Sequence, residues 1–309
     1  MTKLPKNVDL LIPSLPTPLI LIENEITRFA EVKLYIKRDD LIHDTVSGNK
    51  WRKLKYNLLD AKDKGFQSLL TFGGAYSNHL YAVAAAGAGM GFGTIGIVRG
   101  EDHEIRETAT IQFCKDRGMA IHYVSRAEYK KRNDQDYIEE ISSLYGSPYV
   151  IPEGGTTALA LPGVQEMVEE TRQQLGFSPD YFSVAAGTGG TAAGILSAGE
   201  KVLAFAALKG GSFLENDIFK LSGNIKEDGQ LSLFTDYHFG GYAKWNYELL
   251  HFIKHFKVAH RIQLEQVYTA KMLYGLYDLL ISKYFPVGTT IVAVHTGGLQ
   301  GLLPDLVDV

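Results

Sequence analysis

The stretch "SLLTFGGAYSNHLYAVAAAGAGMGFGTIGIV" (residues 68–98) decides the fold class, because two short apolar runs flank a segment of small residues. No Asp, Glu, Lys or Arg occurs in residues 66–98. A membrane-spanning helix is nevertheless rejected, since glycines and polar side chains interrupt the run at short intervals. The pattern instead predicts a buried strand over 68–72, a helix over 77–89 and a second buried strand over 93–98.

The same alternation of apolar runs and helical stretches continues toward the C-terminus. Further strands are predicted over 119–124, 148–152, 181–186, 201–208 and 289–298. Further helices are predicted over 104–117, 134–145, 161–176, 189–199, 247–259 and 269–285. Strands that alternate with helices indicate parallel βαβ units, so we expect an α/β fold. No repeat or linker divides the chain, which favours two interwoven lobes. In residues 214–239 the hydrophobic residues follow neither the helical nor the strand period, so no element is predicted there.

The composition excludes several classes of partner. The chain has 309 residues, a formal net charge of −4 and a pI of about 6.1. Without a basic surface, neither nucleic acid nor an anionic membrane is an expected partner. Cys114 is the only cysteine, so no intrachain disulfide can form, which is typical of a reducing compartment and favours the cytoplasm. Prolines interrupt the apolar N-terminal pieces, so no signal peptide is predicted, and no metal site is predicted either.

The segment "SVAAGTGGTAAG" (183–194) carries glycines and threonines between a predicted buried strand and a helix. Amides at a helix N-terminus bind phosphate, and glycines let the backbone approach the anion. A dinucleotide fingerprint would follow the first strand and have an acid about 20 residues later, and neither condition is met. A turn that binds nothing is the remaining alternative. The predicted phosphate-binding residues are Gly187, Thr188, Gly189, Gly190 and Thr191.

Two other segments carry candidate chemistry. In "TFGGAYSNHL" (71–80), Ser77 is a natural helix N-cap, but the same motif can present a hydroxyl and amides to a substrate carboxylate. In "VSGNKWRKL" (46–54), Lys50 follows a tight turn and opens a helix. On its own, this basic segment is most simply interpreted as a solvated helix face. A lysine amine of lowered pKa can, however, form a Schiff base with an aldehyde. Pyridoxal phosphate carries one aldehyde and one phosphate, so Lys50 and the phosphate site together indicate this cofactor.

Motifs spread over the chain resemble the 1-aminocyclopropane-1-carboxylate deaminase and D-cysteine desulfhydrase family. They are "KRDDLIHDTVSGNKWRKL" (37–54), "GGAYSNH" (73–79), "PEGGTT" (152–157), "GTGGTAAG" (187–194), "VYTAKMLYGLYDL" (267–279) and "HTGG" (295–298). The resemblance implies a pyridoxal-phosphate enzyme of fold type II, the tryptophan synthase β-subunit fold. Two lobes, each a mostly parallel twisted sheet flanked by helices, would hold the cofactor between them. It also implies a homodimer, with residues 1–50 and 160–309 as the large cofactor-binding domain and 51–159 as the smaller domain.

The resemblance assigns roles to individual residues. Lys50 resembles the Schiff-base lysine that carries the proton, and Asn78 resembles the residue that bonds the ring oxygen of the cofactor. Ser77 is similar to the serine near the substrate carboxylate. Tyr242 in "FGGYAK" and Tyr268 in "VYTAK" resemble active-site tyrosines, although Tyr268 is equally compatible with a place in the core. His79 and Thr296 complete the predicted substrate-binding residues, together with Ser77 and Asn78.

Two threonines separate the activities of this family. Thr269 stands where the resemblance places the partner of the pyridine nitrogen, and Thr296 in "HTGG" stands at a second position that differs from ring-opening deaminases. Ring-opening deaminases have Glu and Leu at these places. A carboxylate keeps the nitrogen protonated and the ring a strong electron sink, whereas a hydroxyl only bonds it. As structural residues, Thr269 would be a helix N-cap and Thr296 a strand-end hydroxyl, which is compatible with either activity.

The expected function is therefore a lyase that acts on a small amino acid. Elimination from D-cysteine, giving pyruvate, ammonia and sulfide, is the principal hypothesis. Within the family, the alternative is the deaminase that gives 2-oxobutyrate and ammonia from 1-aminocyclopropane-1-carboxylate. From other classes, the alternatives are a nucleotide-binding oxidoreductase that uses "GTGGTAAG" and a cofactor-binding protein without catalytic activity.

Overall fold

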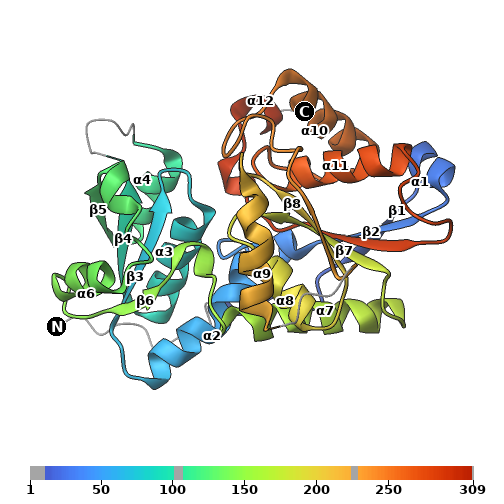
Figure 1. Ribbon diagram of the computed structural model, residues 1–309. Coiled ribbons are helices and arrows are strands. Elements are labelled where there is room, and N and C mark those ends of the chain that lie inside the picture. The colour runs from blue at the N-terminus through green and yellow to red at the C-terminus, as the bar shows by residue number, and fades with distance from the viewer. Residues whose placement is uncertain (1–10, 101–106, 224–228, 308–309) are drawn as a thin grey trace.

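A computed structural model describes residues 11–100, 107–223 and 229–307, which form two lobes built on two sheets (Figure 1). In the larger lobe the strand order is β1-β2-β10-β7-β8-β9, and in the smaller lobe it is β5-β4-β3-β6. The larger sheet comprises β1 (Leu19–Ile22), β2 (Lys33–Lys37), β7 (Tyr181–Ala186), β8 (Val202–Ala206), β9 (Leu231–Phe234) and β10 (Thr290–Val294). The smaller comprises β3 (Ser68–Gly74), β4 (Gly93–Arg99), β5 (Met119–Val124) and β6 (Tyr149–Ile151). Strand β1 pairs antiparallel with β2, and the other paired strands of the described residues run parallel.

Helices cover both sheets (Figure 1). The larger lobe carries α1 (Glu25–Ala30), α7 (Ala160–Leu175), α8 (Gly190–Ser197), α9 (Leu214–Ser222), α10 (Tyr247–His260), α11 (Thr269–Ile281) and α12 (Pro304–Val307). The smaller lobe carries α3 (Asn78–Met90), α4 (Ala109–Asp116), α5 (Arg126–Tyr129) and α6 (Gln135–Ser143). Helix α2 (Asn49–Asp63) lies where the two lobes meet. The predicted α/β fold with mostly parallel sheets is confirmed, and none of the helices described is long and apolar enough to cross a membrane.

Helix α3 shows why the charge-free stretch is rich in small residues. At Gly87, an added Cβ would lie 2.2 Å from Cγ2 of Thr94 on β4, so the helix can approach the sheet only without a side chain there. Ser77 caps the helix by accepting the amides of His79 and Leu80. Gly91 ends it with a φ of 79°, a left-handed conformation that favours glycine.

The bounds of the regular elements match the sequence predictions at two strands. Strands β5 and β7 begin and end at the predicted residues. The segment 214–239, which showed neither period, contains helix α9 and strand β9, with residues 224–228 outside the described part. The helix predicted over 104–117 begins only at Ala109, and residues 104–106 also lie outside the described part.

The N-terminal segment holds elements that the patterns did not predict. Strand β1, helix α1 and strand β2 follow one another within a short stretch, and β1 follows a run of prolines. Strand β1 is only four residues long and β2 five, so neither shows a period of its own. They become strands because β2 pairs with β10 and β1 then pairs with β2.

Helix α2 is anchored by buried ion pairs, so its interpretation as a solvated basic face is wrong. Arg52 is 1% exposed and donates to Asp39 Oδ1 at 2.9 Å and to Glu170 Oε2 at 3.1 Å. The other carboxylate oxygen of Glu170 accepts from Lys37 Nζ at 2.5 Å. These four charges come from β2, the turn after it, α2 and α7. They fix α2 against the larger lobe.

The predicted domain division follows the two sheets, but one of its boundaries cuts an element. The strands of the smaller sheet all lie between residues 68 and 151, within the predicted domain 51–159. The predicted boundary after residue 50 falls inside α2, which packs on α7 of the larger lobe. The division at 50/51 and 159/160 stays a prediction.

The ion pairs of Glu170 predict a large loss of stability when this carboxylate is removed. Glu170→Ala leaves Lys37 and Arg52 buried with too little opposing charge, so we expect the free energy of unfolding to fall by about 3–5 kcal/mol. Urea denaturation followed by circular dichroism measures the change. The control is Glu166→Ala on the same helix, because the ion pair of Glu166 with Lys55 is about one-third exposed. Its removal should cost at most about 1 kcal/mol, and equal losses in both variants would contradict the prediction.

Candidate active site

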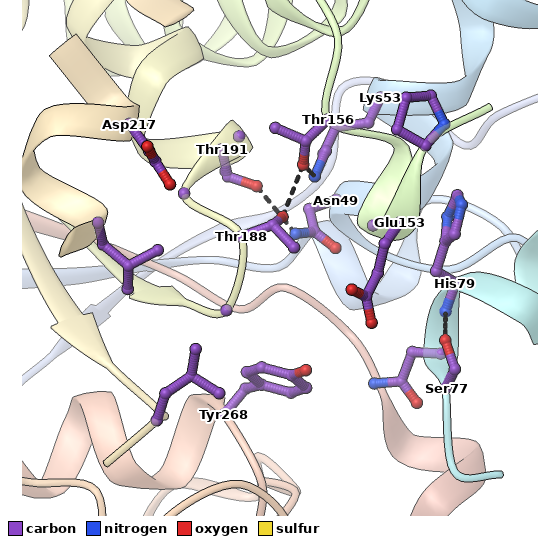
Figure 2. Close-up of a pocket in the computed structure, with 18 of the residues that line it drawn as sticks. Asn49, Lys53, Ser77, His79, Glu153, Thr156, Thr188, Thr191, Asp217 and Tyr268 are labelled. Carbon is purple, nitrogen blue, oxygen red and sulfur yellow. Dashed lines mark hydrogen bonds between the residues drawn. The ribbon is translucent and has the colours of Figure 1, made fainter. Parts of the chain in front are cut away.

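A cavity of about 600 Å³ lies between the two lobes, at the carboxyl ends of strands from both sheets. This is the edge at which parallel α/β sheets bind their ligands. Figure 2 shows Asn49, Lys53, Thr156, Thr188 and Thr191 grouped on one side of it, with Ser77 and His79 on the other. The walls include residues of every quoted motif, and in all motifs but "PEGGTT" (152–157) they include residues that were predicted for the site. These are Lys50, Ser77, Asn78, His79, Gly187, Thr188, Gly189, Gly190, Thr191, Tyr242, Tyr268 and Thr296.

Lys50 lies in the first turn of α2, and the turn before it is held against the larger lobe. Gly48 has a φ of 65°, and a Cβ there would lie 2.0 Å from the carbonyl oxygen of Thr296. Only glycine therefore permits this approach. Lys50 Nζ donates to Oδ1 of Asn49 at 3.0 Å. Burial lowers the pKa of Lys50 to about 8, although the charge of Glu265 acts in the opposite direction. The amine is thereby available in its neutral, nucleophilic form near neutral pH.

Lys53 faces the glycine and threonine loop, a role that the sequence analysis missed. Its Nζ donates to Thr156 Oγ1 at 2.9 Å, and Thr156 Oγ1 lies 2.6 Å from Thr188 Oγ1 (Figure 2). A Cβ at Gly190, the first residue of α8, would lie 2.8 Å from Lys53 Nζ. Burial, and then the charge of Lys50, hold the pKa of Lys53 well below its usual range. The spacing of three residues between the two lysines was the available signal, because it puts both on one face of a helix.

The loop therefore forms a cup suited to a phosphate. Helix α8 directs its N-terminal amides at the cup, and Asn49 Nδ2 donates to Thr191 Oγ1 at 2.8 Å on its rim. A buried ammonium with one hydroxyl partner, beside bare amides, lacks the negative charge that would compensate it. A phosphate dianion would supply that charge.

The predicted carboxylate site contains a hydroxyl and a helix N-terminus. Ser77 Oγ accepts the amides of His79 and Leu80, each at 3.2 Å, so the hydroxyl can still donate its own proton. Asn78 Oδ1 accepts from Gln300 Nε2 at 2.8 Å. His79 lines the cavity, but its Nε2 lies 2.7 Å from Thr71 Oγ1, inside the smaller lobe. Burial holds the pKa of His79 well below its usual range, which makes it a neutral ring. Its role toward substrate stays a prediction.

The two tyrosines form one wall of the cavity. The rings of Tyr242 and Tyr268 lie 6.0 Å apart between centroids, edge to face. Burial raises the pKa of both phenols. A Cβ at Gly187 would lie 3.0 Å from the ring of Tyr268, so the phosphate loop and this ring are in direct contact. The alternative of Tyr268 as only a core aromatic does not hold, since it lines the cavity.

The two threonines lie one behind the other. Thr296 lines the cavity, and Thr269 is fully buried behind it, with 3.4 Å between the two hydroxyl oxygens. Thr269 is the first residue of α11 and not its N-cap. The side chain that caps the helix is Glu265, which accepts the amides of Val267, Tyr268 and Thr269 at 2.7, 2.8 and 2.5 Å. Glu265 was not predicted, because capping across four residues by Glu has no simple sequence signature.

Comparisons with known proteins confirm the predicted family, fold and cofactor. Residues 12–205 match the family model described as "Pyridoxal-phosphate dependent enzyme". A putative 1-aminocyclopropane-1-carboxylate deaminase of Pyrococcus horikoshii is 33% identical, over 92% of this chain and 90% of the relative. The bifunctional D-cysteine desulfhydrase/1-aminocyclopropane-1-carboxylate deaminase of Arabidopsis thaliana, a mitochondrial protein, is 31% identical, over 89% and 74%. The crystal structure of a homologue of the deaminase superposes with a TM-score of 0.79 at 31% identity, covering 94% of this chain and 91% of that one. These matches favour the predicted cofactor over a nucleotide-binding oxidoreductase.

The phosphate cup predicts that a side chain at Gly190 blocks the cofactor. Gly190→Val should weaken binding of pyridoxal phosphate by at least about tenfold, which is about 1.4 kcal/mol. The reason is that the new Cβ would occupy the space beside Lys53 Nζ and Thr156 Oγ1. Equilibrium titration of cofactor-free protein measures the affinity. Gly93→Val serves as the control, because a Cβ there meets nothing closer than 3.5 Å and lies outside the cavity. Unchanged affinity in a folded Gly190→Val variant would remove this loop from the site.

The lowered pKa of Lys50 predicts how cofactor uptake depends on pH. Only a neutral amine attacks an aldehyde, and the pKa of Lys50 is about 8. When cofactor-free protein is mixed with pyridoxal phosphate, the rate at which the visible absorption grows should rise up to about pH 8 and then level off. A solvated lysine, with a pKa of about 10.4, would still gain rate above that pH. Such a continued rise would show that Lys50 is not buried. Borohydride reduces an imine to a stable amine, which bleaches the visible band and fixes the cofactor covalently to its lysine. After this treatment Lys50→Ala should carry no covalently attached cofactor.

Proposed function

The chain belongs to the family of pyridoxal-phosphate dependent enzymes, and on this premise we propose that it is a lyase acting on a small amino acid. The expected reaction is elimination from D-cysteine to pyruvate, ammonia and sulfide. One observation carries the proposal: Lys50, the phosphate cup and Ser77 all open into the same cavity. The relative from Arabidopsis, whose name includes D-cysteine desulfhydrase, supports it.

The residues of the cavity fit the cofactor. Lys53 and the loop 187–191 would hold its phosphate, and the amine of Lys50 would hold its aldehyde carbon. Asn78 would bond its ring oxygen, and the hydroxyls of Thr296 and Thr269 would lie toward its ring nitrogen. When bound, the cofactor supplies an electron sink for the charge left on Cα after a proton is removed.

The surrounding side chains would each have a different role toward the substrate. Lys50 Nζ, neutral near its pKa of about 8, is the base that takes the proton from Cα. Ser77 Oγ donates to the carboxylate of the substrate, and the nearby N-terminus of α3 attracts that negative charge. Tyr242 and Tyr268 stay neutral because burial raises their pKa values, so they act as hydrogen-bond donors beside the reacting carbon.

The threonine pair favours elimination over ring opening. Thr269 and Thr296 would bring hydroxyls to the place where a carboxylate would protonate the ring nitrogen, and the buried Glu265 bonds three amides of α11. The electron sink is then weak. Opening a cyclopropane ring breaks a carbon–carbon bond without a good leaving group, so it depends on a strong sink. In elimination from cysteine, the thiolate leaves as the proton is lost, so this reaction depends less on a strong electron sink.

A substrate panel tests the proposal. Keto-acid formation is measured with D-cysteine, L-cysteine, D-serine, β-chloro-D-alanine and 1-aminocyclopropane-1-carboxylate. We expect pyruvate from D-cysteine or β-chloro-D-alanine, little or no 2-oxobutyrate from the cyclopropane amino acid, and no product in Lys50→Ala. The double variant Thr269→Glu with Thr296→Leu should shift the ratio toward ring opening. A wild-type protein that opens the ring efficiently and leaves both D-amino acids unchanged would overturn the elimination reaction. Cofactor binding without any turnover would favour the non-catalytic alternative.

We also propose a homodimer and a cytoplasmic location. The resemblance to the deaminase and desulfhydrase family supports a homodimer, which sedimentation or light scattering can test. The single cysteine supports the cytoplasm, whereas the related Arabidopsis protein is named as mitochondrial.

A further inference from the structure

Arg99 stands at the carboxyl end of β4, directly beside the loop that carries Ser77. In the register of the smaller sheet, Arg99 is paired with Gly74, the last residue of β3. A Cβ built on Gly74 would lie 3.6 Å from Nη2 of Arg99. The backbone carbonyl of Gly74 accepts the amide of Ser77 at 3.0 Å. The guanidinium therefore lines the cavity next to the predicted carboxylate site.

The guanidinium of Arg99 has no polar partner within residues 11–100, 107–223 and 229–307. Its only recorded side-chain contact there is with the ring of Tyr129, 5.7 Å away. The side chain is exposed to the solvent of the cleft. Guanidinium groups carry five N–H donors in a planar fork that matches carboxylate and phosphate oxygens. Arg99 thus presents unused donors and a full positive charge to whatever enters.

The neighbouring charges leave that positive charge uncompensated. Arg132 also stacks on Tyr129, at 5.1 Å, but its Nε donates to Glu153 Oε2 at 2.6 Å. The other oxygen of Glu153 accepts from the hydroxyl of Tyr129 at 2.9 Å. Figure 2 shows the Glu153 carboxylate projecting into the cavity between Ser77 and Thr188. Because Glu153 is matched by Arg132, the three described side chains Arg99, Arg132 and Glu153 together keep one positive charge.

Tyr242 lines the same cavity as Ser77 and Arg99. Burial raises the pKa of Tyr242 and the charge of Glu153 adds to this shift, whereas the hydrogen bond with Tyr268 and the positive charge of Arg99 oppose it. Ser77, Arg99 and Tyr242 therefore border the same space. A substrate whose carboxylate lies at Ser77 would extend its side chain through that space.

We propose that Arg99 is a specificity-determining residue that binds a negatively charged group on Cβ of the amino-acid substrate. The preferred substrate class is then an α-amino acid with an anionic β-substituent, such as a carboxylate, a phosphate ester or a sulfonate. This rests on the proposed function, because it concerns the substrate of the same site. The planar donor fork of arginine suits such groups better than a point charge does.

The same contact assists elimination when the anionic group can leave. With a phosphate ester, the proton on Cα moves to Lys50 Nζ, and the C–H electron pair becomes the Cα–Cβ double bond. The Cβ–O bond breaks, and its electron pair leaves on the phosphate oxygen, so no oxidant or reductant is needed. Arg99 bonds the oxygens on which this charge grows. Stabilising the leaving group matters more here because the ring nitrogen faces only the hydroxyls of Thr269 and Thr296.

Binding is tested with a pair of amino acids that cannot react and differ in side-chain charge. α-Methylaspartate and α-methylasparagine lack the α-proton, so they bind without turnover, and both enantiomers are titrated into the holoenzyme while its visible spectrum is followed. We expect wild type to bind the aspartate analogue at least about tenfold more tightly than the asparagine analogue. In Arg99→Gln this preference should disappear, and in Arg99→Lys part of it should remain. Circular dichroism checks that each variant is folded.

Arg117→Gln is the matched control. Arg117 is also exposed and also stacks on one ring, Phe113, at 4.9 Å, but it lies outside the cavity. This variant should keep the wild-type preference. Equal affinity of the two analogues in wild type, or an unchanged preference in Arg99→Gln, would overturn the role of Arg99.

Turnover measurements distinguish a failure of the role proposed for Arg99 from a failure of the lyase activity. The value of kcat/KM is compared between O-phosphoserine and O-methylserine, in both enantiomers, for wild type and Arg99→Gln. We expect wild type to favour the phosphate ester and Arg99→Gln to lose that advantage. If D-cysteine is eliminated but charge on the β-substituent has no effect, the role of Arg99 fails and the lyase stands. If no amino acid yields a keto acid, the lyase itself fails.

Discussion

Buried ion pairs around Arg52 hold the helix on which the site depends. Arg52 bonds Asp39 and Glu170, and Glu170 also bonds Lys37, so β2, α2 and α7 are joined through charges with little access to water. The backbones of α2 and α7 are equally close, since a Cβ at Gly163 would lie 1.9 Å from the carbonyl oxygen of Arg52. Burying ions is unfavourable unless each is matched, so this arrangement tolerates few alternatives. It fixes the direction in which α2 presents its first turns to the cleft.

Two lysines on that helix then acquire different tasks. Lys50 and Lys53 lie on one face of α2, and burial lowers the pKa of both. Lys50 opens toward the centre of the cavity, whereas Lys53 meets the loop at Gly190. A bound phosphate would compensate Lys53 and leave the neutral amine of Lys50 to act as nucleophile and base. The phosphate dianion of the cofactor would account for the buried Lys53, and its aldehyde would account for the buried Lys50.

The opposite end of the cavity is built to be neutral. Glu265 is a buried carboxylate close to the place expected for the ring nitrogen, but its oxygens bond three amides at the start of α11. That leaves the hydroxyls of Thr269 and Thr296, which lie 3.4 Å apart. Positive charge is instead found at the mouth, on Arg99. In the proposed reaction the site would combine a weak electron sink with a group suited to an anionic substituent, and both would favour elimination of a good leaving group.

The sequence by itself determined the fold class, the buried strands and the motif residues of the site. Strands such as 119–124 and 181–186 are mostly apolar runs bounded by turns, and the glycine loops mark places where the backbone approaches other groups closely. These signals are local, because a period or a turn is set by neighbouring residues. Only the tertiary structure decided that Lys53 faces the loop 187–191, that Arg52 is buried, that Glu265 caps α11 and that Arg99 lines the cavity beside Ser77. It also decided that β1, β2 and β9 are strands, since β2 pairs with the distant β10, and β1 and β9 add to the two edges of the sheet. The physical reason is that burial, charge pairing and strand pairing depend on residues far apart in the chain, which no local pattern contains.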